Sequence, residues 1–168
     1  MQDLRDKTRI YSVGHSDHTI EAFLHLLQKH QIAVVVDVRS QPYSQWVPQF
    51  NREPLQRSLE AADVRYVYLG HSLGGRPTGM PVVEPDQGQH RCADSEPRSP
   101  FEAGLETLLG MARQQRTAVM CAEGDHRQCH RDKLIAPALL KRAARVLHIQ
   151  SGGGVVEARP EPRQLKFL

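Results

Sequence analysis

The chain has 168 residues, of which 39% are hydrophobic and 24% are charged, with a formal net charge of +3 and three cysteines. This length and composition predict one globular domain with one sizeable core, and the slight basic excess favours anionic over cationic ligands. No apolar run has the length of a membrane span, the first residues lack the apolar core of a signal peptide, and three cysteines make no disulfide framework, so we expect a cytoplasmic protein without membrane contact.

The first half of the chain alternates strand and helix signals. β-branched and aromatic runs predict three strands, over residues 9–14, 32–38 and 64–69. Apolar side chains at helical spacing predict two helices between these strands. One begins after Thr19, which can cap it, and the other has Pro54 in its first turn.

The second half begins with a stretch rich in glycine and proline, residues 70–99, which predicts a long loop or lid. Ser99 to Glu102 form a capping box that starts the next helix. A strand over 117–121, a helix with a kink or a late start at Pro137, and a strand over 145–149 follow. The order of elements is therefore strand and helix in alternation to the end.

This alternation predicts an α/β fold, namely a single-domain three-layer sandwich with a mostly parallel sheet of about five strands and helices on both faces. We expect residues 9–150 to form the domain, residues 1–8 an N-terminal extension, and residues 151–168 a loose C-terminal tail. The pattern determines neither the order of the strands in the sheet nor the oligomeric state.

In a parallel sheet the loops that follow the strands gather at the carboxyl edge, where ligands bind. Here these loops contain several reactive side chains: His15, Ser16, Asp37, Arg39, Cys121 and Glu123. Cys129, His130 and Arg131 then begin a helix, and helix amides attract anions. We therefore expect a pocket for a small anionic ligand, such as a phosphate or a nucleotide, at this edge.

Five ordered motifs span about residues 9–150. They are Val13-Gly14-His15-Ser16, Val36-Asp37-Val38-Arg39-Ser40 with Pro42, Gln49-Phe50-Asn51-Arg52, Leu73-Gly74-Gly75, and Cys121-Ala122-Glu123 followed by Cys129-His130-Arg131. Together they resemble the bacterial domain-of-unknown-function 488 family. The resemblance implies an α/β domain and supports this choice of site residues, but it supplies no reaction.

Cys121 has two interpretations. As a nucleophile, it would ionise readily near a helix start, and with Arg127 it fits the C-x5-R pattern of cysteine phosphatases and rhodaneses. However, Glu123 and Asp125 in that loop would repel a phosphate dianion. We favour the second interpretation, a small apolar residue at the end of a buried strand.

The thiols and imidazoles of this region also suggest zinc. The candidate ligands are Cys121, His126, Cys129 and His130. Because their spacing lacks the compact C-x2-C signature, we predict no metal site and no cofactor. A redox or metal role for the cysteines stays open as a third alternative.

The charged residues can act on a ligand or on one another. The guanidinium groups of Arg39, Arg131 and Arg52 suit phosphate or carboxylate, but a structural ion pair with Asp37 or Glu123 is an equal alternative. The two carboxylates, if close together, can divide acid and base roles. His15 is an acid, a base or a satisfied histidine, and Asn51 is a helix cap or a substrate contact.

Two functions of different class follow. The first is an enzyme that hydrolyses or transfers a group on a phosphorylated or nucleotide-like substrate. Its expected catalytic residues are Glu123, Asp37, His15 and, less favoured, Cys121, and its expected ligand-binding residues are Arg39, Arg131, Ser16, Asn51, Arg52, His130 and Cys129. The second is a non-catalytic module that binds nucleic acid or nucleotide through Tyr43, Trp46 and Phe50, although we slightly prefer that this loop covers its own hydrophobic cluster.

Overall fold

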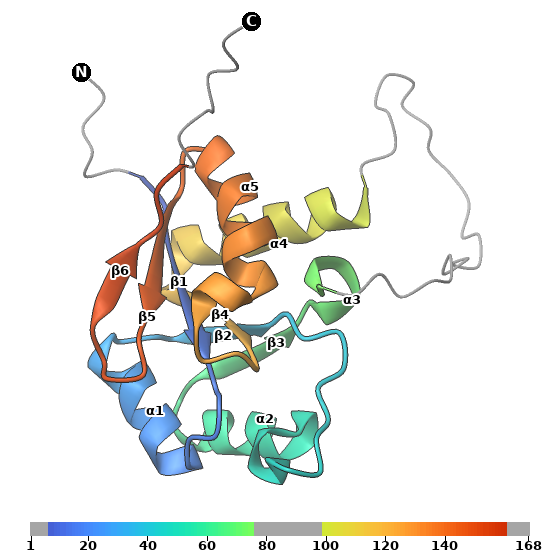
Figure 1. The fold of residues 1–168 in the computed structure, drawn as a ribbon, viewed down its shortest axis with the longest axis vertical. Helices are drawn as coiled ribbons and strands as arrows, with labels where there is room; N and C mark the ends of the chain where they lie inside the picture. Colours follow the sequence, from blue (N-terminus) through green and yellow to red (C-terminus); the bar gives the residue numbers. More distant parts are fainter. Residues whose placement is uncertain (1–6, 76–98, 161–168) are drawn as a thin grey trace, which may run out of the picture.

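The computed structural model describes residues 7–75 and 99–160. In this part of the chain one sheet has the strand order β3-β2-β4-β1-β5-β6 (Figure 1). Its strands are β1 (Arg9–Gly14), β2 (Val34–Asp37), β3 (Arg65–Tyr68), β4 (Thr117–Cys121), β5 (Arg145–Ile149) and β6 (Val155–Glu157). The first five are parallel to their neighbours and β6 is antiparallel to β5, so the predicted mostly parallel sheet is confirmed.

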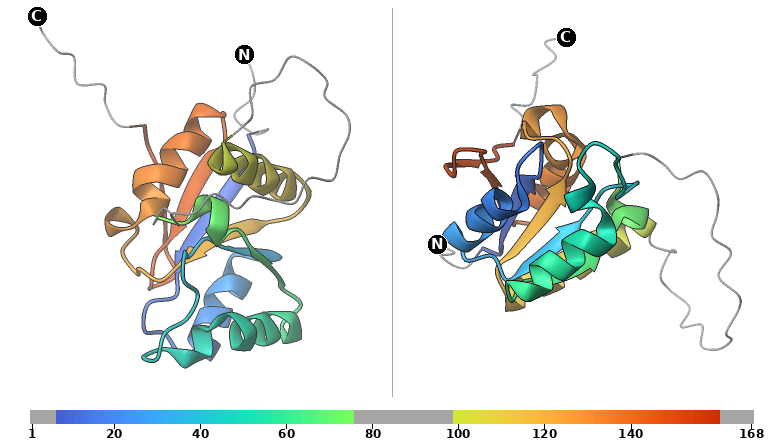
Figure 2. Two further views of the ribbon diagram at one scale, coloured as in Figure 1. Left: turned by 90° about the vertical axis from the view of Figure 1, so that its right-hand side faces the viewer. Right: turned by 90° about the horizontal axis from the view of Figure 1, so that it is seen from below.

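Helices cover both faces of the sheet. They are α1 (Ile20–Lys29), α2 (Arg52–Ala61), α3 (Gly70–Leu73), α4 (Pro100–Gln114) and α5 (Ala136–Lys141), with 3-10 turns η2 (Pro48–Phe50) and η3 (His126–Gln128) and the π-helical turn η4 (Arg131–Ile135). Figures 1 and 2 show α1 and α2 on one face and α3, α4 and α5 on the other. None of these helices combines the length and apolarity needed to cross a membrane.

The core lies in two layers, one on each side of the sheet. Val34 and Val36 of β2 pack with the leucines of α4 and α5, whereas Val35 between them packs with α1 and α2. Because side chains alternate along a strand, a run of three buried valines requires cover on both faces. The β-branched run in the sequence therefore indicated the three-layer arrangement correctly.

Local signals fix the helix starts. The Thr19 side chain accepts a hydrogen bond from the Ala22 amide at 3.1 Å, and Ser99 accepts one from the Glu102 amide at 3.2 Å. α5 begins at Ala136, directly after the π-helical turn η4, so the chain is already helical before Pro137. In η4 the turn widens, and the Ala136 amide bonds to the Arg131 carbonyl. Of the two predicted alternatives, a late start at Pro137 is wrong, and the widened turn before the proline is the local distortion of the helix.

Two segments differ from the sequence prediction. Residues 70–73 of the expected long loop form α3, whose Leu73 is fully buried in the core below α4. The expected loose tail contains β6, because Val155 and Val156 follow a tight turn in which Gly153 has a φ of +87°. Residues 1–6 of the expected extension, 76–98 of the expected loop and 161–168 of the expected tail lie outside the described residues.

Candidate active site

The carboxyl ends of three neighbouring strands bring predicted site residues together. β2, β4 and β1 are adjacent in the sheet, and their ends place Asp37, Cys121 and His15 at one edge. The loops continue the pairing for a short distance, since the His15 amide donates to the Cys121 carbonyl at 3.0 Å. The convergence expected from the sequence thus has a defined geometry.

Arg39 and Asp37 form a buried ion pair. Arg39 donates from Nε to Asp37 Oδ1 at 2.9 Å and from Nη2 to Oδ2 at 2.7 Å, and the Tyr66 hydroxyl also donates to Oδ2 at 2.7 Å. Asp37 is fully buried and Arg39 is 7% exposed. A bidentate pair with further hydrogen bonds compensates the cost of burying two charges. The ion-pair alternative therefore describes Arg39, and the Asp37 carboxylate is held in place rather than open to substrate.

His15 completes this network as a neutral histidine. Its Nδ1 donates to the Ser16 carbonyl at 2.8 Å, so Nε2 is left to accept from Arg39 Nη1 at 3.2 Å. The ring stacks on Phe50 with 4.4 Å between centroids. Burial lowers the pKa of His15 from 6.5 to about 4, with the Arg39 charge acting in the same direction. The satisfied histidine is the interpretation that this geometry supports.

His15 should make the protein less stable as the pH falls from 6.5 to about 4. In this window the unfolded histidine binds a proton that the folded one does not, so the free energy of unfolding rises with pH. His15→Gln should reduce that slope by up to about 1.4 kcal/mol per pH unit. Urea unfolding at several pH values measures it, and the exposed His25→Gln is the control. Equal slopes in wild type and His15→Gln would contradict the assignment.

Cys129 and Cys121 form a close pair of free thiols. Their sulfur atoms are 2.7 Å apart, and the residues are 3% and 2% exposed. Cys129 Sγ also accepts from the backbone amide and from Nε of Arg131, both at 3.5 Å, and lies 3.5 Å from His130 Nδ1. The hydrogen bond from Cys121, then those from His130 and Arg131, hold the pKa of Cys129 well below its ordinary value, although burial opposes this.

The same hydrogen bond and burial raise the pKa of Cys121. These opposite directions favour Cys121 as the donor of the pair and Cys129 as the sulfur that ionises more readily. A thiolate is the reactive form of cysteine, whether as nucleophile or in redox chemistry. Of the two cysteines, Cys129 rather than Cys121 is therefore the one whose surroundings favour the thiolate.

The guanidinium of Arg131 is buried beside the Cys129 sulfur, and its positive charge favours a thiolate there. Arg131 is 1% exposed, and besides Cys129 it donates from Nη1 to the Ser12 hydroxyl at 2.9 Å and from Nη2 to the Glu123 carbonyl at 2.6 Å. Within residues 7–75 and 99–160 it forms no ion pair with a carboxylate. A buried guanidinium requires a compensating anion, and of these partners only the Cys129 sulfur can ionise.

Gly14 allows the close approach that builds this cluster. A Cβ atom at residue 14 would lie 1.8 Å from the Glu123 carbonyl oxygen and 3.0 Å from Arg131 Nη2. We expect Gly14→Ala to lower the free energy of unfolding by about 2 kcal/mol or more, because backbone must move. Gly110→Ala on α4 is the matched control, since nothing lies within 4 Å of a Cβ there, and it should stabilise slightly. Urea unfolding measures both, and a neutral Gly14→Ala would contradict the packing argument.

A pocket of about 390 Å³ opens beside the thiolate. Its lining includes Arg39, Tyr43, Cys121, Glu123, Cys129 and His130. The Nε2 atom of His130 is buried and has no hydrogen-bond partner among the described residues. A buried polar atom without a partner is a place where a ligand group can bind. The wall of the pocket thus contains a thiol, a carboxylate and a ring nitrogen without a hydrogen-bond partner among the described residues.

Several predicted site residues make structural contacts outside the pocket. Asn51 Oδ1 accepts from the Ser44 amide at 2.7 Å and closes the loop before α2, and the Arg52 guanidinium lies 4.6 Å above the Tyr68 ring. The Ser16 hydroxyl donates to Asp17 at 3.3 Å. None of Asn51, Arg52 and Ser16 lines the 390 Å³ pocket.

The C-x5-R pattern does not form a phosphate loop. Arg127 is 77% exposed and pairs with Asp125 at 2.9 Å, so its guanidinium binds a carboxylate within the same turn. The four candidate zinc ligands are also divided, because His126 stacks on His148 with 4.1 Å between centroids instead of joining the two thiols. The C-x5-R spacing is therefore present in the sequence, but the backbone does not bring Arg127 to Cys121 in the way a phosphate loop requires.

The loop after β2 is open to solvent at its aromatic residues. Trp46 is 84% exposed and Tyr43 is 57% exposed, whereas Phe50 is buried under His15. The preferred interpretation, a loop folded over its own hydrophobic cluster, is therefore wrong for Trp46 and Tyr43. The residues that neighbour Tyr43, Trp46 and Phe50 in the sequence do not indicate which of the three side chains is buried.

Comparison with known proteins gives one family. The family model described as "Domain of unknown function DUF488" matches residues 19–137, most of the chain. This segment includes the Asp37–Arg39 pair and the Cys121–Cys129–Arg131 cluster. No curated protein and no solved structure matches the sequence.

Proposed function

The chain belongs to the domain-of-unknown-function 488 family, and from its pocket chemistry we propose an enzyme that transfers or hydrolyses a group on a small anionic substrate, with Cys129 as nucleophile. One observation carries this proposal: the Cys129 sulfur accepts hydrogen bonds from Arg131 and lies 2.7 Å from the Cys121 sulfur at the wall of an open pocket. A phosphorylated or nucleotide-like compound is the substrate class that the basic groups of the pocket favour.

The reaction needs a nucleophile, a proton donor and a route for release. The Cys129 sulfur attacks the electrophilic atom, taken here as phosphorus; an S–P bond forms and the bond from phosphorus to the leaving oxygen breaks. Glu123, exposed at the pocket wall, is placed to protonate the leaving oxygen and then to take a proton from the water or alcohol that releases the group.

Arg39 and Arg131 were both expected to bind the ligand, but in this proposal they have different roles. Arg131 stabilises the thiolate before and after transfer, and Arg39 lines the pocket while Asp37 balances its charge. His130 adds an unpartnered ring nitrogen near the sulfur. Anion binding thus depends on His130 and on the open side of Arg39, with Arg131 and Asp37 as positioning residues.

A covalent intermediate tests the proposal. The protein is incubated with p-nitrophenyl phosphate and with a p-nitrophenyl ester of thymidine 5′-monophosphate. After nitrophenolate is released, mass spectrometry of the protein detects the adduct and the residue that carries it. We expect a phosphoryl or nucleotidyl adduct on Cys129. Arg127→Ala is the matched control, because this exposed side chain lies outside the pocket, and it should react at the wild-type rate. Loss of the reaction in Arg127→Ala, or an adduct on Cys121, would contradict the mechanism.

A second candidate function is supported by the exposed loop. Trp46 and Tyr43 present aromatic surface that can stack on bases, and Arg52 lies on the adjacent helix. A non-catalytic nucleic-acid module should bind single strands with an affinity that falls as salt rises. Trp46→Ala should weaken this binding at least about tenfold, and Glu123→Gln should not change it. Absent or salt-independent binding would remove this candidate.

A further inference from the structure

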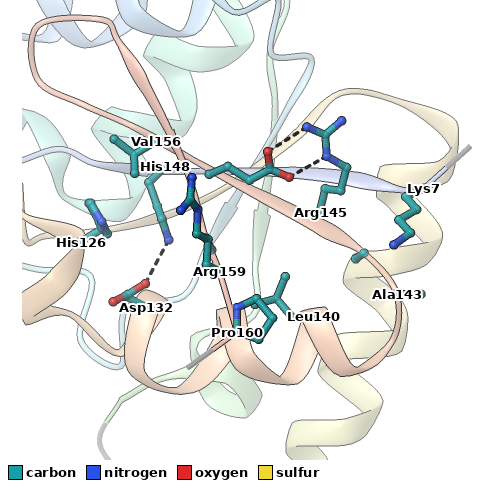
Figure 3. A pocket seen from close by; sticks show the side chains of 13 residues that line it. Lys7, His126, Asp132, Leu140, Ala143, Arg145, His148, Val156, Arg159 and Pro160 are labelled. Carbon is teal, nitrogen blue, oxygen red and sulfur yellow. Dashed lines mark hydrogen bonds and ion pairs between the residues drawn. The ribbon is translucent and has the colours of Figure 1, made fainter. Parts of the chain in front are cut away.

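A second cavity, separate from the cysteine pocket, lies between β5, β6 and α5. Its volume is about 730 Å³, and the side chains around it include His126, Asp132, Arg145, His148 and Glu157 (Figure 3). We propose that His126, Asp132 and His148 bind one divalent transition-metal ion, zinc or a metal of similar preference, at the inner wall of this cavity. No part of the proposed reaction uses these three residues, so the proposal goes beyond the proposed function.

The three side chains already lie near the spacing that a metal requires. One ligand atom from each of His126, Asp132 and His148 lies within 4.8 Å of the other two. His148 comes from β5, His126 from η3 and Asp132 from η4, so three separate elements converge (Figure 3). Ligands at bond lengths of about 2.0 to 2.2 Å need only a small inward movement from this arrangement.

His148 gives an independent indication of a ligand. It is 1% exposed, and its Nε2 atom is buried with no hydrogen-bond partner among the described residues. Asp132 Oδ1 lies 3.2 Å away, at the distance of an ion pair. A buried ring nitrogen beside a carboxylate and a second histidine is satisfied when a cation binds between them.

Each ring is oriented through its other nitrogen. His148 Nδ1 lies 2.7 Å from the Ser12 hydroxyl, which also accepts from Arg131, and His126 Nδ1 lies 3.2 Å from the Gln150 amide nitrogen. Such second contacts fix the direction in which a ligating imidazole presents its free nitrogen. Nε2 of His148 is therefore the atom left for the metal. His126 can ligate through Nε2 when the Gln150 amide turns its oxygen toward Nδ1, because the amide nitrogen only donates.

The donor set indicates the class of metal. Two imidazoles and one carboxylate suit zinc, cobalt or nickel better than magnesium or calcium, which prefer oxygen ligands. Three protein ligands leave a fourth position that faces the cavity. Lys7, Arg145 and Arg159 also line the cavity, and of these Arg145 is paired with Glu157 at 2.7 Å, which reduces its repulsion of a cation.

Titration with metal tests the site. Full-length protein is freed of metal with a chelator and titrated with Co²⁺ by visible absorption and with Zn²⁺ by calorimetry. We expect one ion per chain and the d–d absorption of cobalt with nitrogen and oxygen ligands. His126→Asn and Asp132→Asn, both at partly exposed positions, should fold normally and bind at least about tenfold more weakly.

Two controls separate this site from other sources of binding. His25→Asn removes an exposed histidine of α1, and Cys129→Ser removes the thiolate, so both should bind metal as the wild type does. The proposal is overturned if no stoichiometric binding occurs, or if His126→Asn and Asp132→Asn bind normally. Binding that disappears in Cys129→Ser would instead place the metal on the thiols.

Discussion

Cys129→Ser should abolish turnover of any substrate that forms the covalent intermediate, with a loss of at least about three orders of magnitude in kcat. Serine places a hydroxyl where the thiolate lies, and a hydroxyl does not ionise beside Arg131. Initial rates at saturating substrate measure the effect. Turnover within about tenfold of the wild type in Cys129→Ser would remove Cys129 from the mechanism.

Cys121→Ser is the matched control for this substitution. The Cys121 thiol donates to Cys129, and a serine hydroxyl at the same place can still donate. We therefore expect Cys121→Ser to keep most of its activity, with a loss of about tenfold at most. If Cys121→Ser is as inactive as Cys129→Ser, both sulfurs take part in the chemistry, as in a dithiol redox enzyme.

Arg131→Met should raise the pKa of Cys129 toward its ordinary value and reduce turnover at pH 7 at least about tenfold, because a charged hydrogen-bond donor to the thiolate is lost. Methionine fills a comparable volume without a charge, so the fold should persist. Activity should recover in part as the pH rises, since a free thiol ionises at alkaline pH. Turnover that falls equally at all pH values would contradict a role through the thiolate.

A double-mutant comparison separates charge pairing from packing. Cys129→Ser alone leaves a buried guanidinium without its anion and should cost about 3 kcal/mol of unfolding free energy. Adding Arg131→Met removes that unpaired charge, so the double variant should be more stable than Cys129→Ser alone. Urea unfolding of the four proteins gives the coupling energy. Additive effects would mean that the Arg131–Cys129 contact carries no charge interaction.

Much of the fold could be predicted because its signals are local. The helix starts at Thr19 and Ser99 depend on side chains within three residues, and the run Val34 to Val36 shows its burial on both faces directly. β6 was missed because its three residues gain a strand partner only through the turn around Gly153. Short strands depend on a neighbour rather than on their own composition.

The site was predicted less completely, for a physical reason. The sequence indicated which loops carry the reactive residues, and it offered an Arg39–Asp37 ion pair as one alternative. It did not indicate strand order, and the insertion of β1 between β4 and β5 is what places Ser12 against Arg131 and His148. The Ser12 contacts span more than a hundred residues and depend on this order, so they could not be predicted from pattern. The Cys121–Cys129 contact spans only eight residues, but it depends on the path of the loop between them, which the sequence pattern did not indicate.

The pH dependence of alkylation at Cys129 tests the central claim most directly. With Cys92 replaced by serine, iodoacetamide reacts with the remaining thiols, and peptide mass spectrometry gives the rate at each residue between about pH 4 and 10. We predict modification of Cys129 with a midpoint far below the ordinary value of about 8.5, and slow modification of Cys121. A midpoint near 8.5, or faster reaction at Cys121, would contradict a thiolate at Cys129.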